Sequence, residues 1–550
     1  MSQKMIWGAY EKSIAQWLEK ADKLSLVQRL WEKDASLWSQ DSEVKKEIVR
    51  RLGWLELVKP MKREVGSLTA FADEIKKEGF EKVLLLGMGG SSLAPEMFQA
   101  VFGNKKGSPE LLTLDSTDPL SVRDVESKVN IEKTLFIVSS KSGGTLELLS
   151  FFKYFFAKAK EKRGDEAGRQ FVAITDSGTP LARLAEENNF RRVFLAPEDV
   201  GGRFSALTFF GLVPAALIGV DVAAVLEGAE KMVARTSPII SAADNPAALL
   251  GVAMAILAEE GRDKLTVVTE ARFESFGDWA EQLVAESTGK EELGIIPVVR
   301  EPLEEPAVYG EDRFFVALLS DSEEGRHLEK RLEAFQKQGH PVLTLKIKDE
   351  RDLGAEFFRW EMATAIACAL MKINAFDQPD VQAAKDRAKA LLKSVESGKT
   401  LDLKPSEISA EAFESCLKSD DYVAILAFLP DQEMLRGKLN ELRFHIRNRT
   451  KLAVTLGLGP RYLHSTGQLH KGGPNIGAFL LMTVQHTEDL PIPGEKYSFG
   501  QLESAQALGD FEALHAKGRR VFHLRLEDLS ETHLTETFQK IQMSIDAAVL

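Results

Sequence analysis

The chain has 550 residues, 44% of them hydrophobic, which is enough material for about three or four domains with buried cores. Its formal net charge of −13 predicts an acidic surface that repels nucleic-acid phosphates and anionic membranes, so neither is an expected partner. The net charge does not exclude binding of a small anionic ligand, because a local pocket can be positive on an acidic protein. The two cysteines and an N-terminus without an apolar signal core together predict a cytoplasmic protein.

Residues 1–80 have apolar side chains at roughly helical spacing among charged ones, which predicts an N-terminal helical arm. Residues 81–221 are expected to form a first α/β unit. Its apolar runs, each followed by a segment of helical character, are Val83–Leu86, Leu111–Leu114, Leu135–Val138 and Phe171–Ile174. Continuous apolar strands separated by helices indicate a parallel sheet covered on both faces. The run Ser205–Val220 is too short to span a membrane and predicts a buried helix.

A second α/β unit is expected in residues 222–395, and a C-terminal α/β extension in residues 396–550, with a linker around Val395–Ser409. The strand-like runs are Leu265–Thr269, Phe314–Leu319, Pro341–Lys346, Tyr422–Phe428, Leu452–Leu456 and Arg520–Arg525. The predicted fold class is therefore α/β, with two doubly wound parallel-sheet units, a helical arm before them and an α/β extension after them.

Two loops follow predicted strands of the first unit. The first, Gly87–Leu93, contains Gly90 and Ser91 and leads into a helix, so its backbone N–H groups can approach an anion. It is similar to a dinucleotide-binding loop, and Asp115 stands where a ribose-binding acid would, so an NAD-dependent dehydrogenase is one alternative. A purely structural turn is the other.

The second loop, Ser139–Thr145, offers several hydrogen-bond donors at the start of a helix: Ser140, Lys141, Ser142 and Thr145. A phosphate monoester accepts several hydrogen bonds and carries about −1.5 to −2 charge, which suits this set. Capping of the helix would need only one hydroxyl, so capping alone is the less favoured interpretation.

These loops belong to an ordered series of motifs that resembles the sugar-isomerase (SIS) family, and specifically the phosphoglucose isomerases. The series runs from Val83 to Lys385 and consists of Gly87–Ser91, Ser140–Thr145, Gly201–Ser205, Gln282–Lys290 and Ile373–Lys385. The remaining C-terminal part is similar to the isomerase half of fused transaldolase–isomerase proteins. The resemblance implies SIS-type, flavodoxin-like units and reversible isomerisation of glucose 6-phosphate and fructose 6-phosphate. That reaction opens the sugar ring and passes through an enediolate, with a sugar phosphate as the partner, no cofactor and no metal.

By this resemblance Glu286 is the base that moves a proton between C2 and C1, and Gln282, one helical turn earlier, faces the same site. Without the resemblance, an exposed i, i+4 pair between Glu286 and Lys290 is the favoured interpretation. Arg203, on a glycine-flexed loop, matches the family arginine that stabilises the charge of the enediolate.

Lys385 matches the family lysine and Gln378 the family glutamine, although Pro379 and Asp380 depart from the usual residues between them. Taken alone, Lys385 would be a solvated residue on a charged helix.

The family histidine is missing from its usual Gly-Gln-His motif before Phe-Asp-Gln. A later loop rich in Gly, His and Lys, His464–Gly473, is expected to replace it. His470 is the first candidate and His464 the second, from the same or a neighbouring chain.

A third alternative is a non-catalytic sugar-phosphate-binding protein of the SIS type, which would need neither Glu286 nor Lys385. The sequence leaves open whether the sugar is glucose or mannose phosphate, which anomer is preferred, and whether the chain forms a homodimer.

Overall fold

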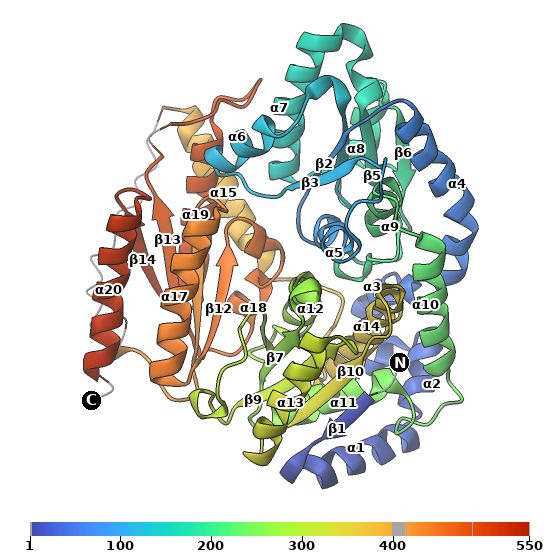
Figure 1. Cartoon of the computed structure of the whole chain (residues 1–550), viewed down its shortest axis with the longest axis vertical. Helices are drawn as coiled ribbons and strands as arrows, with labels where there is room; N and C mark the ends of the chain where they lie inside the picture. The colour runs from blue at the N-terminus through green and yellow to red at the C-terminus, as the bar shows by residue number, and fades with distance from the viewer. Residues whose placement is uncertain (1–2, 399–412, 414, 487, 549–550) are drawn as a thin grey trace.

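A computed structural model describes residues 3–398, 413, 415–486 and 488–548. It contains three separate sheets (Figure 1), and their strands fall within the three α/β segments expected from the sequence. One further strand, β1 (Gln3–Ile6), lies in the predicted helical arm and pairs antiparallel with the edge of the second sheet. The rest of the arm is helical as predicted, in α1 (Glu11–Lys23), α2 (Leu26–Trp31), α3 (Ser42–Val49) and α4 (Val58–Lys77).

The first sheet has the order β3-β2-β4-β5-β6 and is parallel throughout. Its strands are β2 (Lys82–Gly87), β3 (Glu110–Leu114), β4 (Thr134–Ser139), β5 (Phe171–Thr175) and β6 (Arg192–Leu195). Every residue of β4 and β5 is buried, which explains the continuous apolar runs of the sequence. The order is the flavodoxin-like one, and its direction reverses between β2 and β4. The loops after these two strands therefore diverge and leave a crevice.

Helices connect and cover this sheet: α5 (Leu93–Phe102), α6 (Pro119–Ser127), α7 (Leu146–Arg163) and α8 (Pro180–Glu187). The apolar run after Ser205 forms α9 (Phe209–Leu217), whose residues from Phe210 onward are all buried, as expected. Two helices, α10 (Val222–Arg235) and α11 (Pro246–Glu259), lead into the second sheet and pack against the long buried α14 (Leu353–Met371). None of the described helices is long and apolar enough to cross a membrane.

The second sheet, β1-β10-β9-β7-β8, repeats the same order in its four parallel strands, β7 (Lys264–Thr269), β8 (Ile296–Val298), β9 (Arg313–Leu319) and β10 (Val342–Lys346). The helix α12 (Glu274–Thr288) follows β7 and occupies the centre of the molecule between the three sheets (Figure 1). α13 (Glu323–Lys337) connects β9 to β10.

The third sheet, β12-β11-β13-β14, is entirely parallel and again has this order. Its elements are β11 (Tyr422–Phe428), α17 (Glu433–Thr450), β12 (Ala453–Leu458), α18 (Gly467–Gly472), β13 (Gly477–Val484), α19 (Phe499–Ala516), β14 (Arg520–Leu526) and α20 (Glu531–Ala548). α15 (Val381–Glu396), which the sequence assigned to the second unit, packs against α19 of this third unit. Most of the expected linker, residues 399–409, lies outside the described residues.

Candidate active site

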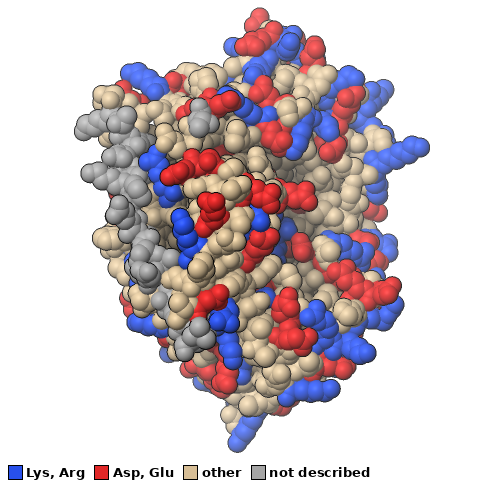
Figure 2. Space-filling view, turned by 60° about the vertical axis from the view of Figure 1, so that its left-hand side comes forward, with Lys and Arg blue, Asp and Glu red and all other residues tan. Residues whose placement is uncertain are grey.

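The main cavity, of about 1310 Å³, lies where the first sheet changes direction and faces α12 and the third unit. The residues after β2 and β4 line one side. Further lining residues include Gly201–Arg203, Gln282 and Glu286 of α12, several of residues 374–385, and Leu463–His464. Ligands of open parallel sheets bind at such a change of direction. On the face seen in Figure 2, acidic and basic side chains are interspersed around the hollowed regions.

The first loop is closely packed against two of these segments. A Cβ atom on Gly90 would lie 2.2 Å from the carbonyl oxygen of Gly202. Gly89 has a φ of +54°, and a Cβ there would lie 2.7 Å from the carbonyl oxygen of His464. The glycines are therefore required for close backbone approach, which brings the arginine loop and the histidine loop to the end of β2. Gly90 and Ser91 both line the cavity, as the site prediction requires.

The second loop places its four donors along the cavity. Thr145 is the N-cap residue of α7, but its side chain makes no capping hydrogen bond. Its Oγ1 instead lies 2.9 Å from Oγ of Ser140, which also accepts the N–H of Gly143 at 3.1 Å. Lys141, one of the four expected donors, is engaged within the protein, because its Nζ donates to Asp176 at 2.5 Å. The hydroxyls and the N-terminus of α7 are thus the groups of this loop that could contact an anion.

Glu286 lies on the face of α12 that is turned to the cavity. Its Oε1 is 3.3 Å from Nη1 of Arg203, and its Oε2 accepts a hydrogen bond from Nε2 of Gln282 at 3.2 Å. Arg203 is only 5% exposed and is held by Ser287 Oγ at 2.8 Å, Gln378 Oε1 at 3.2 Å and the carbonyl of Ala375 at 2.5 Å. A guanidinium fixed in this way can stabilise negative charge without reorganising.

The alternative Glu286–Lys290 surface pair does not form. Lys290 is 2% exposed, and its Nζ donates to Oδ1 of Asp377 at 2.8 Å. Burial lowers the pKa of Lys290, with the Arg203 charge acting in the same direction. The carboxylate of Glu286 therefore has Arg203 as its cationic neighbour instead.

His464 reaches the cavity from the third unit. Its Nε2 lies 2.9 Å from Oε1 of Glu147, in the first turn of α7. Burial alone would raise the pKa of Glu147, but the charge and hydrogen bond of His464, with a smaller effect of Lys385, lower it to about 2. The Glu147 carboxylate thus fixes the orientation of the His464 ring.

The structure corrects the preference for His470. This residue is 2% exposed and does not line the cavity, and its Nδ1 lies 3.0 Å from the hydroxyl of Tyr422. Its ring packs against Tyr422, Tyr462 and Phe479. Burial lowers its pKa well below the usual range. The side chain of His470, on α18, is therefore part of the buried core, whereas His464, the second candidate, lines the cavity.

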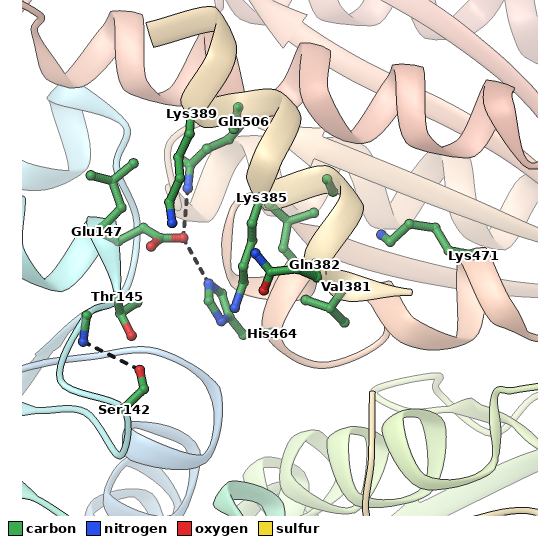
Figure 3. Close-up of a pocket in the computed structure, with 15 residues that line it drawn as sticks. Ser142, Thr145, Glu147, Val381, Gln382, Lys385, Lys389, His464, Lys471 and Gln506 are labelled. Atoms are coloured by element: carbon green, nitrogen blue, oxygen red, sulfur yellow. Dashed lines mark hydrogen bonds and ion pairs between the residues drawn. The ribbon is translucent and has the colours of Figure 1, made fainter. Parts of the chain in front are cut away.

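Lys385 projects from α15 and lines both the main cavity and a smaller pocket of about 240 Å³ that continues from it. Figure 3 shows this smaller pocket, with Glu147 and Thr145 on one side and Lys385, Lys389 and His464 on the other. Gln378 also lines the cavity and accepts a hydrogen bond from Arg203. Of the two residues that depart from the family pattern, Asp380 has a structural role, since its carboxylate accepts hydrogen bonds from Gln468 and Lys517.

Sequence reasoning missed two residues of this site. Glu147 looked like an ordinary acid in the first turn of a helix, where it suits the helix dipole. Gln506 comes from α19, and its Nε2 donates to Oε1 of Glu147 at 2.8 Å while its Oε1 accepts from Thr117 at 2.8 Å. Spacing along the chain carries no signal for Gln506, because this contact joins residues of different units.

The dinucleotide interpretation of the first loop depended on Asp115. This carboxylate lies 3.1 Å from Nη1 of Arg461 and does not line the main cavity. Burial raises its pKa to about 6. Asp115 therefore belongs to an internal ion pair and is not placed to bind a ribose in the main cavity.

Comparisons with known proteins find phosphoglucose isomerases both by sequence and by structure. The model of the phosphoglucose isomerase family matches residues 60–301. A glucose-6-phosphate isomerase of Prochlorococcus marinus (strain NATL2A) is 31% identical over 383 residues, which cover 62% of this chain and 72% of that protein. A glucose-6-phosphate isomerase of Methanocaldococcus jannaschii is 31% identical over 57% of this chain and 85% of that protein. The crystal structure of a glucose-6-phosphate isomerase from Chlamydia trachomatis has the same fold, with a TM-score of 0.55 at 19% identity, over 70% of this chain and 85% of that one.

Proposed function

The chain belongs to the phosphoglucose isomerase family, and we propose that it interconverts glucose 6-phosphate and fructose 6-phosphate with Glu286 as the base. The observation that carries this assignment is the Glu286–Arg203 pair, a carboxylate 3.3 Å from a fixed guanidinium in a cavity that also holds the hydroxyls of Ser140 and Thr145. A proton-transfer base, a cation for the enediolate and a phosphate cradle are the three groups that aldose–ketose isomerisation of a sugar phosphate needs.

The phosphate is proposed to bind the Ser140–Thr145 loop, where hydroxyls and backbone N–H groups surround the N-terminus of α7. This contact fixes one end of the sugar. The other end then extends towards α12, because Gln282, Glu286 and Arg203 line the same cavity. Binding energy from the phosphate, which does not react, thereby positions the reacting carbons.

Ring opening requires that the C1 hydroxyl loses a proton, which passes to solvent water in the cavity, while the ring oxygen gains one. His464 and Lys385 both line the cavity and carry exchangeable protons. We assign proton delivery to the ring oxygen to His464, because Glu147 and Gln506 fix its orientation. Lys385 faces the same space and supports the transfer by its charge.

In the open-chain sugar, Glu286 takes the proton from C2, and the carbonyl oxygen at C1 becomes negative as the enediolate forms. Arg203 stabilises this charge. A proton then passes between the oxygens of C1 and C2, and Glu286 returns its proton to C1, which gives the ketose. All atoms of the sugar are retained.

The test is a coupled assay that follows glucose 6-phosphate formed from fructose 6-phosphate by the full chain, without added metal. Turnover by the wild type and its loss in Glu286→Gln support the assignment. Turnover by neither protein, or by both at equal rates, contradicts it.

The cytoplasmic location is also a proposal, supported by the low cysteine content of two in 550 residues, since disulfide-rich sequences are typical of oxidising compartments. A homodimer stays a prediction, and sedimentation of the full chain will check it. Mannose 6-phosphate in the same assay tests the sugar preference that the sequence left open.

A further inference from the structure

A buried group of two carboxylates and one imidazole lies where the third unit meets the first sheet. Asp118 is the N-cap residue of α6, Glu503 lies on α19, and His486 follows β13. One ligand atom from each of the three residues lies within 4.8 Å of the others. Among the described residues this is the one His/Cys/Asp/Glu group with such spacing, and none of its members lines the active-site cavity.

Two oxygen atoms of this group lack hydrogen-bond partners although they are buried. Oδ2 of Asp118 and Oε1 of Glu503 accept no hydrogen bond, and the two residues are 0% and 2% exposed. Leaving a carboxylate oxygen buried and unpaired costs free energy, so each oxygen calls for a positively charged partner.

The charge of the group is also unbalanced. Two carboxylates face a single imidazole, and the nearby Arg123 is used by Glu488 and by the carbonyl of Asp489. A divalent cation would supply the missing positive charge.

The orientation of His486 is that of a metal ligand. Its Nε2 lies 2.7 Å from Oε2 of Glu503, while its Nδ1 lies 3.8 Å from the unpartnered Oδ2 of Asp118. An ion bound by all three residues would take the place of the proton between Nε2 of His486 and Oε2 of Glu503. Two ligand atoms at about 2.1 Å from a zinc ion are roughly 3.4 Å apart in a tetrahedron, so a small movement of these side chains suffices.

We propose that Asp118, His486 and Glu503 form a binding site for a first-row divalent transition-metal ion such as Zn²⁺, which accepts imidazole and carboxylate ligands together. Water completes the coordination. The ion joins α6 of the first unit to α19 of the third. Gln506 lies one turn after Glu503 on α19 and binds both Thr117 and Glu147. The ion therefore also stabilises the position of α19, which contacts the His464–Glu147 pair through Gln506.

The experiment uses the full chain, stripped with a chelator and then titrated with Zn²⁺ by calorimetry, with metal content measured after gel filtration. Asp118→Asn and Glu503→Gln remove one ligand charge each. The asparagine keeps an oxygen that can accept the N–H of Ser121, so the cap of α6 is retained. Glu488→Gln is the matched control. It removes a carboxylate that lies two positions after His486 but pairs with Arg123 and does not belong to the group.

We expect one Zn²⁺ per chain in the wild type and in Glu488→Gln, with a higher Tm in its presence. Asp118→Asn and Glu503→Gln should bind at least about tenfold more weakly and lose the Tm increase. Co²⁺ in place of Zn²⁺ should give a visible absorption band that His486→Gln abolishes. Absence of stoichiometric Zn²⁺ binding in the wild type, or equal binding in all variants, overturns the site and leaves an internal ion-pair group.

Discussion

Nε2 of His464 and Oε1 of Glu147 lie 2.9 Å apart, although 317 positions separate the two residues in the chain. Glu147 belongs to the helix that follows the phosphate-binding loop, and His464 belongs to the third sheet unit. Their contact therefore makes the site depend on how the C-terminal unit packs against the first. Glu286, Arg203, the Ser140–Thr145 loop and His464 all line one cavity of the same chain.

Replacing His464 by Ala should slow turnover of the cyclic sugar by about 10²-fold or more, because proton delivery to the ring oxygen is lost. Proton exchange on an open-chain analogue should be much less affected, since Glu286 and Arg203 remain. Both rates can be measured, the first by the coupled assay and the second by NMR detection of solvent deuterium.

The comparison for this prediction is His470→Phe. His470 is packed among aromatic rings and hydrogen-bonded to Tyr422, so its loss should lower stability and leave the ratio of the two rates unchanged. A selective ring-opening defect in His470→Phe, with normal behaviour of His464→Ala, would return the role to His470.

The acid stability of the protein should depend on Glu147. Its pKa is lowered from the ordinary value of 4.5 to about 2, which corresponds to about 3 kcal/mol of stability. Because the pKa is lowered in the folded state, this contribution is complete above pH 4.5 and is lost as the pH falls towards 2. Urea unfolding between pH 6 and 3 should show a steeper loss for the wild type than for Glu147→Gln. Parallel curves would exclude this carboxylate as a source of acid sensitivity.

Much of the fold was predictable, because strands buried on both faces leave continuous apolar runs in the sequence. β1 was not predicted: its four residues show no strand pattern of their own, and pairing with the edge strand β10 gives them their conformation. The loops of the cavity were predictable because they follow strands directly. The choice between His464 and His470 was not, since both stand in one glycine-rich loop and only the aromatic rings around His470 decide which side chain is buried.

Glu286→Gln should lower kcat by about 10²–10⁴-fold, because the amide keeps the shape but cannot accept the C2 proton. Binding of a polyol 6-phosphate, which has no carbonyl group to isomerise, should be nearly unchanged in calorimetry. Glu274→Gln is a matched control in the first turn of the same helix, where the carboxylate pairs with Arg300. Near-full activity of Glu286→Gln would mean that another residue takes the proton.

The double substitution Ser140→Ala and Thr145→Ala should raise KM for fructose 6-phosphate about 10²-fold or more and have a smaller effect on kcat. Each lost hydrogen bond to a charged phosphate contributes about 1.5–3 kcal/mol. The stability of α7 should change little, because the Thr145 side chain makes no capping hydrogen bond.

The control for this double variant is Ser322→Ala, which removes a hydroxyl that caps the helix α13. This variant should lose about 1 kcal/mol of stability with an unchanged KM. If the double variant weakened binding of a non-phosphorylated sugar equally, the loop would not be a phosphate cradle.

Dialysis against a chelator should leave the rate of isomerisation intact when the assay runs well below the Tm. The reason is geometric: the one group of described residues with metal-ligand spacing is Asp118, His486 and Glu503, and none of them lines the cavity that holds Glu286. Proton transfer by a carboxylate, with a guanidinium to stabilise the enediolate, supplies the required chemistry. A rate that falls after chelation and returns with a divalent ion, while circular dichroism shows an intact fold, would contradict this prediction. A lower Tm at an unchanged rate would instead fit a metal that stabilises the joint between the first and third units.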